Sequence, residues 1–108
     1  MAMEKHIHDQ LVAMITHLST RRNMYIPDER YSSLAAFMMG YLLSVRDITH
    51  TDPSEQFQRW LQKKQGRGFS VHWSHYILMQ MADNDEENAS ALLLELFAAY
   101  LADARVEE

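Results

Sequence analysis

Histidine is the residue type of this 108-residue chain best suited to metal binding or proton transfer, and there are six of them. His72 and His75 are three positions apart, so they would share one face of a helix. A zinc site needs further ligands at matching spacing, and the sequence has no HExxH motif. We therefore expect no metal site and no cofactor. One hypothesis for function, which stays open beside the two given below, is a small helical enzyme that uses His72, His75 and nearby acids.

Motifs for nucleophilic or phosphate-binding chemistry are also missing. The chain has no cysteine, which excludes a thiolate nucleophile, a thiolate metal site and a disulfide. It has no GxSxG, Walker A or GxGxxG motif, and its one GxG, at residues 66–68, follows a predicted helix instead of a strand. The sequence therefore predicts that the protein is not an enzyme.

Acidic residues are concentrated in the last quarter of the chain. Residues 83–108 contain eight acids and one base, a net charge of −7, whereas residues 1–82 have a net charge of +2. One interpretation is that these acids complement the dipole of the last helix and keep the end of the chain solvated. The other is an acidic surface that docks on a basic partner and speeds their association.

The docking interpretation predicts a contact surface of carboxylates with an aromatic anchor, because aromatic residues contribute strongly to interfaces. The candidate residues are Asp83, Asp85, Glu86, Glu87, Asp103, Glu107, Glu108, Trp73 and Tyr76. The net charge of −5 disfavours free nucleic acid as a partner. No signal peptide is evident, and the longest apolar runs, 34–43 and 91–102, are too short to span a bilayer. We expect a cytoplasmic protein that does not contact a membrane.

Apolar residues repeat with helical spacing along most of the chain. The helices that they predict must position the candidate contact residues. The clearest repeat, from Ala89 to Leu101, predicts a last helix over about residues 85–104. Further helices are predicted over about 4–19, from Ser32 or Ser33 to 47, over 53–65 with Asp52 as N-cap, and over 73–82. No strand with a period of two is evident. The predicted fold is all-α, a compact single-domain bundle of about five helices over residues 1–108.

Gly40 falls in the middle of the second predicted helix, where glycine costs about 1 kcal/mol relative to alanine. Close approach of another helix is the usual compensation, so we expect Gly40 and Tyr41 at a helix crossing. The chain also has eight methionines, which fit either the core or an adaptable binding groove. Exposed methionine and leucine faces would support a second hypothesis, a homo-oligomeric helical adaptor or regulator without catalytic activity.

Several segments resemble a family of small helical bacterial proteins. Arg21–Ile26 and Ser33–Tyr41 are similar to the pattern R-P-x-M-Y-(I/L)…L-x-x-(F/Y)-x-x-G-(Y/F), although Arg22-Asn23 stands in place of the Arg-Pro pair. A tryptophan-bearing helix at 57–61, an S-x-x-W segment at 70–73 and an acidic, leucine-rich last helix follow, as in that family. The members resemble immunity proteins of bacterial toxin systems, including contact-dependent growth inhibition. The resemblance implies a cytoplasmic inhibitor that binds the C-terminal domain of one cognate toxin, often an RNase or a DNase, and occludes its active site or substrate-binding surface.

Overall fold

The computed structural model describes residues 2–107 of the chain. Within this range, five α-helices make up most of the chain: α1 (Lys5–Arg21), α2 (Tyr31–Thr49), α3 (Pro53–Gln65), α4 (Trp73–Tyr76) and α5 (Glu86–Asp103). A short 3-10 turn, η1 (Arg22–Met24), follows α1, and a π-helical segment, η2 (Ile77–Met81), continues α4. Two three-residue strands lie near the chain ends, β1 (Ala2–Glu4) and β2 (Arg105–Glu107). The predicted all-α bundle is confirmed.

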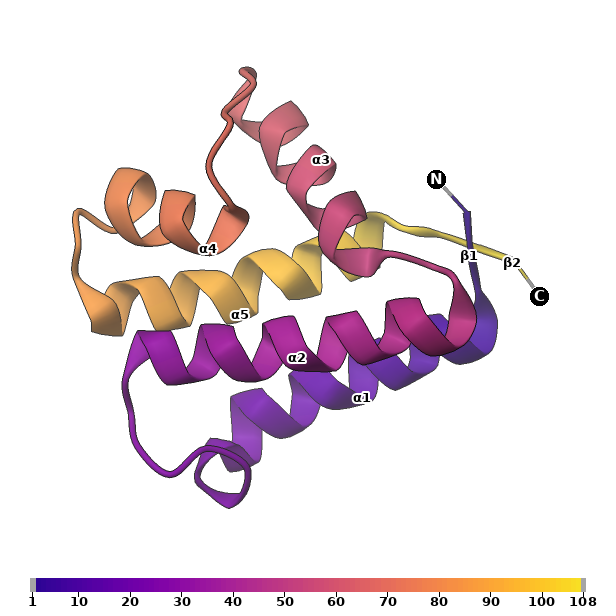
Figure 1. Cartoon of the computed structure of the whole chain (residues 1–108), viewed down its shortest axis with the longest axis horizontal. Helices are drawn as coiled ribbons and strands as arrows, with labels where there is room; N and C mark the ends of the chain where they lie inside the picture. The colour runs from indigo at the N-terminus through magenta and orange to yellow at the C-terminus, as the bar shows by residue number, and fades with distance from the viewer. Residues whose placement is uncertain (1, 108) are drawn as a thin grey trace.

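The last long helix, α5, is the centre of the bundle. It contacts α1, α2, α3 and η2, and in Figure 1 the helices α1 and α2 lie on one side of it and α3 and α4 on the other. Ala89, Leu93 and Phe97, on successive turns of α5, are completely buried. None of the described helices combines the length and the apolar character needed to cross a bilayer.

A cluster of aromatic rings joins α3, α4 and α5. The ring of Phe57 lies at its centre, with the ring centroids of Trp73, Phe97 and Tyr100 at 5.4, 5.0 and 5.6 Å. Both Phe57 and Trp73 are completely buried. These edge-on and tilted contacts are the geometry that aromatic rings prefer, and they fix the angle at which α3 packs across α5.

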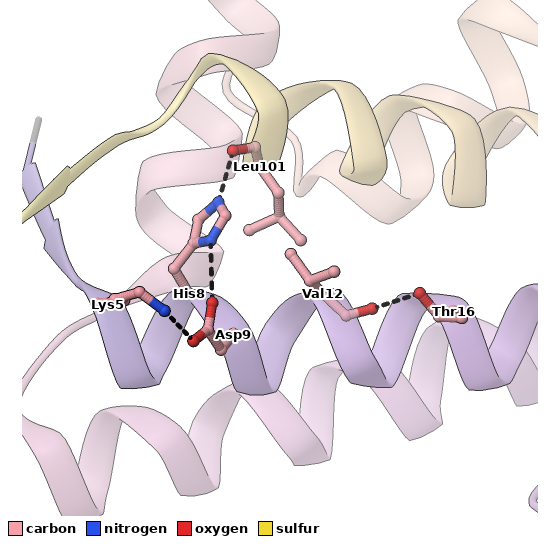
Figure 2. A network of polar contacts seen from close by, with 6 residues as sticks. All are labelled: Lys5, His8, Asp9, Val12, Thr16 and Leu101. Carbon is pink, nitrogen blue, oxygen red and sulfur yellow. Dashed lines mark hydrogen bonds and ion pairs between the residues drawn. The ribbon is translucent and has the colours of Figure 1, made fainter.

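The two ends of the described chain lie together (Figure 1). Strands β1 and β2 pair in parallel, with Met3 opposite Val106 and Glu4 opposite Glu107. Beside this ladder the Nε2 atom of His8 lies 2.8 Å from the carbonyl oxygen of Leu101, as Figure 2 shows. The expectation of no strand was wrong here, because three residues are too few to show a period of two in the sequence.

The start of α2 also differs from its prediction. The helix begins at Tyr31, and Arg30 at its N-cap makes no side-chain capping bond. Instead, the Asp28 carboxylate accepts hydrogen bonds from the Arg30 amide at 2.9 Å and from the Ser33 hydroxyl at 3.1 Å. The Glu86 carboxylate accepts a bond from the Tyr31 amide at 3.2 Å. A residue 55 positions away in the sequence therefore supplies part of the cap, and no local pattern could indicate it.

The surroundings of Gly40 correct another expectation. Gly40 is exposed on α2, and a Cβ atom added there would meet no described atom of another helix or loop within 4 Å. Tyr41 is partly buried against the core, as expected for a packing residue. No helix crosses α2 at Gly40 within the described part of this chain.

Candidate functional site

Helix α5 separates the predicted acidic contact residues into two groups. It has 18 residues, so its ends are about 27 Å apart. Asp83, Asp85, Glu86 and Glu87 lie at its N-terminal end, whereas Asp103 and Glu107 lie at its C-terminal end. Glu108 lies outside the described residues. The acids that are clustered in the sequence therefore do not form one surface.

The backbone before α5 holds the first group in a fixed arrangement. Asp83 and Asn84 have φ values of 51° and 62°, which turn the chain sharply between η2 and α5. The Asp85 carboxylate caps α5 by accepting a hydrogen bond from the Asn88 amide at 3.1 Å. The Glu86 carboxylate reaches the first turn of α2, where it also lies 3.9 Å from the Arg30 guanidinium. The N-terminal ends of α2 and α5 are thus joined directly (Figure 1).

This junction brings two further acids to the first group. Asp28 and Glu29 lie just before α2 and are not among the contact residues predicted from the sequence. We call the six exposed acidic residues of this junction the acidic end: Asp28, Glu29, Asp83, Asp85, Glu86 and Glu87. Segments 22–30 and 83–87 also contain Arg22 and Arg30, so their net charge is −4.

The helix dipoles do not cancel this charge. Each helix N-terminus is equivalent to about +0.5 of an elementary charge, so α2 and α5 together offset about one negative charge. The hydrogen bonds that Asp28 accepts from the Arg30 amide and the Ser33 hydroxyl hold its pKa below the usual range. Asp28 is therefore ionised near neutral pH, and a negative surplus remains at the acidic end.

The second group of acids is largely engaged within the chain. The Asp103 carboxylate accepts hydrogen bonds from the Trp60 indole at 2.9 Å and from Lys64 at 3.2 Å, and these bonds lower its pKa. Glu107 lies beside Glu4 in the β1–β2 ladder. Helix α3 adds three bases on this side of the molecule: Arg59, Lys63 and Lys64. Positive charge therefore accompanies Asp103, in contrast to the acidic end.

Neither predicted aromatic anchor is available at the surface. Trp73 is completely buried and donates its indole N–H to the Ser54 hydroxyl at 2.9 Å, and Tyr76 is 3% exposed and stacks on Phe69. Their placement corrects the expectation, because an anchor must reach into a partner's pocket. Tyr25 is an exposed ring, at 42% exposure, but it stacks on His17 in the groove between α1 and α2.

His72, the first histidine of the predicted pair, has a structural role at the start of α4. The Nδ1 atom of His72 accepts a hydrogen bond from the Ser74 amide at 3.1 Å, which caps α4, and it lies 2.8 Å from the Ser74 hydroxyl. Burial lowers the pKa of His72, so the ring is neutral near pH 7 and can accept this bond. Among the described residues, no three histidines or acids are grouped so that they could hold a metal ion.

The chain has no significant match among protein-family models, curated proteins or solved structures.

Proposed function

We propose that this chain is an immunity protein that binds and neutralises the C-terminal domain of a cognate bacterial toxin in the cytoplasm. The observation that carries the proposal is the acidic end, where two helix starts gather six exposed acids. A nuclease must hold phosphates, so its cleft is basic and matches such a surface. The mechanism is occlusion of the active site or of the substrate-binding surface, with no chemistry by this chain.

The acidic end is partly organised before any partner binds. Asp28, Asp85 and Glu86 are held by backbone amides of the helix starts. Side chains that are already fixed lose less conformational entropy in a complex, so more of the electrostatic attraction contributes to affinity. Among the described residues, Glu29, Asp83 and Glu87 form no ion pair and no side-chain hydrogen bond, so they are the acids most free to contact a basic partner.

The proposal predicts that charge reversal at the acidic end weakens toxin binding. The partner for the test is the toxin domain encoded immediately upstream of this gene, co-purified with the chain at several salt concentrations. We expect a one-to-one complex that blocks toxin activity and weakens as salt rises. The double variant Asp83→Lys/Glu87→Lys should lose at least about tenfold in affinity, mainly through slower association.

The matched control is Glu95→Lys/Glu107→Lys, which changes the net charge by the same amount on other parts of α5 and β2. It should retain binding close to that of the unchanged chain. Absence of a complex, or a complex that leaves toxin activity intact, would contradict the proposed function. Equal losses in both double variants would show that only net charge matters and would contradict the assignment of the surface.

A further inference from the structure

A groove between α3 and the C-terminal end of α5 lies at the opposite end of α5 from the acidic end (Figure 1). Its volume of about 620 Å³ is within the range of small-molecule sites. The described residues that line it include three bases and one acid, so its net charge is +2 in a chain whose net charge is −5. We call it the basic groove, and its polar lining consists chiefly of Gln56, Arg59, Trp60, Lys63, Lys64 and Asp103.

Helix α3 supplies one wall of the basic groove. Gln56, Arg59 and Lys63 are spaced by three and four positions, so they lie along one face of the helix. On the opposite wall, the hydroxyl of Tyr100 on α5 donates a hydrogen bond to Gln56 Oε1 at 2.9 Å. This bond joins the two walls and fixes the orientation of the Gln56 amide group.

The polar atoms that remain free on α3 are hydrogen-bond donors. Because Gln56 accepts through Oε1, its amide nitrogen keeps both N–H groups, and neither has a partner among the described residues. Lys63 forms no ion pair and no side-chain hydrogen bond within residues 2–107. Arg59 donates from Nη2 to Glu55 at 2.7 Å, which leaves its other guanidinium N–H groups for a ligand.

A positive surplus remains when neighbouring charges are counted. Asp103 is the acid of the lining, and its carboxylate is already bonded to Lys64 at 3.2 Å. Glu55, the partner of Arg59, lies just outside the groove and is balanced by Arg105, which forms no ion pair among the described residues. The C-terminal dipoles of α3 and α5 together offset about one positive charge of the lining. Both ion pairs are exposed, and exposed pairs of this kind hold their side chains only weakly.

We propose that the basic groove binds a small organic phosphate. The free donors call for hydrogen-bond acceptors, and the positive surplus calls for an anion. A phosphate group has a charge of about −1.5 to −2 near neutral pH and three acceptor oxygens. It can therefore accept from Gln56, Arg59 and Lys63 together, whereas a carboxylate has one charge and two oxygens.

The organic part of the ligand lies against Trp60. A phosphate ion alone fills only a small part of about 620 Å³. The rings of Trp60 and Tyr100 both line the groove, with their centroids 6.2 Å apart. The Nζ atom of Lys64 lies 5.6 Å from the centre of the Trp60 ring. An anion that contacts Lys64 therefore brings an attached ring or chain close to the indole.

Tryptophan fluorescence with phenyl phosphate tests the proposal. The chain has two tryptophans, and Trp73 is completely buried, so Trp60 reports on the groove. We expect a saturable change with phenyl phosphate. Inorganic phosphate, measured by competition, should bind at least about tenfold more weakly because it buries no ring. Phenol has the ring without the charge and should not bind at the same concentrations. No saturable change, or equal affinity for phenyl phosphate and either reference compound, would overturn the inference.

A pair of double variants assigns the binding to this groove. Arg59→Gln/Lys63→Gln should weaken phenyl phosphate binding at least about tenfold, because hydrogen bonds to charged groups are strong. Both side chains are exposed and glutamine is a good helix former, so helical circular dichroism should be unchanged. The matched control Lys5→Gln/Arg46→Gln removes the same charge from exposed positions of α1 and α2 outside the groove and should bind as before. Equal losses in the two double variants would overturn the inference.

The basic groove is independent of the proposed function, since the acidic end contributes no residue to it. The binding measurements contain no toxin and leave the acidic end unchanged. Failure of phenyl phosphate to bind is therefore distinguishable from failure of the chain to bind a toxin.

Discussion

The Nδ1 atom of the His72 ring caps the first turn of α4. Nδ1 accepts the Ser74 amide hydrogen only while the ring is neutral, and protonation ends this role. Burial lowers the pKa of His72, so the folded chain binds fewer protons at this site than the unfolded chain does. The contribution to stability is therefore complete above the unfolded pKa of about 6.5 and is lost as pH falls through the lower pKa of the folded state.

This linkage predicts that the free energy of unfolding falls between about pH 7.5 and pH 5 and that His72→Asn reduces the fall, because asparagine caps helices independently of pH. Urea denaturation at several pH values measures the effect. The control is His75→Asn on the same helix, which leaves the cap formed by His72 in place. The same slope in all three proteins would refute the role of His72.

Helix α3 shows how a local motif can define an element. Asp52 precedes Pro53, and its carboxylate accepts a hydrogen bond from the Glu55 amide at 3.1 Å. At the other end, Gly66 has φ = 71°, the left-handed conformation that ends helices. Both boundaries agree with the prediction. Helix α2 is the contrasting case, because Glu86 of α5 supplies part of its cap.

We predict that Asp52→Ala lowers the free energy of unfolding by about 1 kcal/mol, because the Glu55 amide loses its partner. Asp52→Asn should restore most of this loss, because the amide oxygen also accepts the bond. Thermal or urea denaturation distinguishes the variants. If Asp52→Asn were as unstable as Asp52→Ala, the carboxylate charge and not the cap would be responsible.

At the scale of the whole molecule, folding places a group of acids and a group of bases at different ends of α5. The acidic end lies where α2 and α5 begin, whereas Arg59, Lys63 and Lys64 lie on α3 near the other end of α5. This separation orients the molecule in the field of a charged partner. The β1–β2 ladder instead brings two like charges together, because Glu4 and Glu107 lie opposite each other.

Glu107→Lys should therefore raise the free energy of unfolding by about 0.2–1 kcal/mol, since an opposite-charge pair replaces a like-charge pair. The gain should shrink as salt is added. Chemical denaturation at low and high salt tests both statements. Glu95→Lys, an exposed change with no paired acid, is the control and should stay within about 0.5 kcal/mol of the unchanged chain. An equal gain from both substitutions would indicate an effect of net charge alone.

Most of the helices could be predicted from the sequence, because the evidence for them is local. The spacing of apolar residues, the Asp52-Pro53 start and the Gly66 end are all readable within a few turns, and the predicted all-α bundle is confirmed. The sequence did not predict that Trp73 and Tyr76 are buried, since aromatic residues are common both in cores and at interfaces.

Which side chains share a surface depends on how the helices pack, and the sequence did not show it. Packing of α2 beside α5 brought Asp28 and Glu29 to Asp83–Glu87, and the length of α5 removed Asp103 and Glu107 from them. The same packing left Gly40 exposed, against its prediction. The physical reason is that periodicity shows which face of a helix is buried, but not which helix covers it. That choice depends on contacts between residues far apart in the sequence, such as Glu86 with Tyr31.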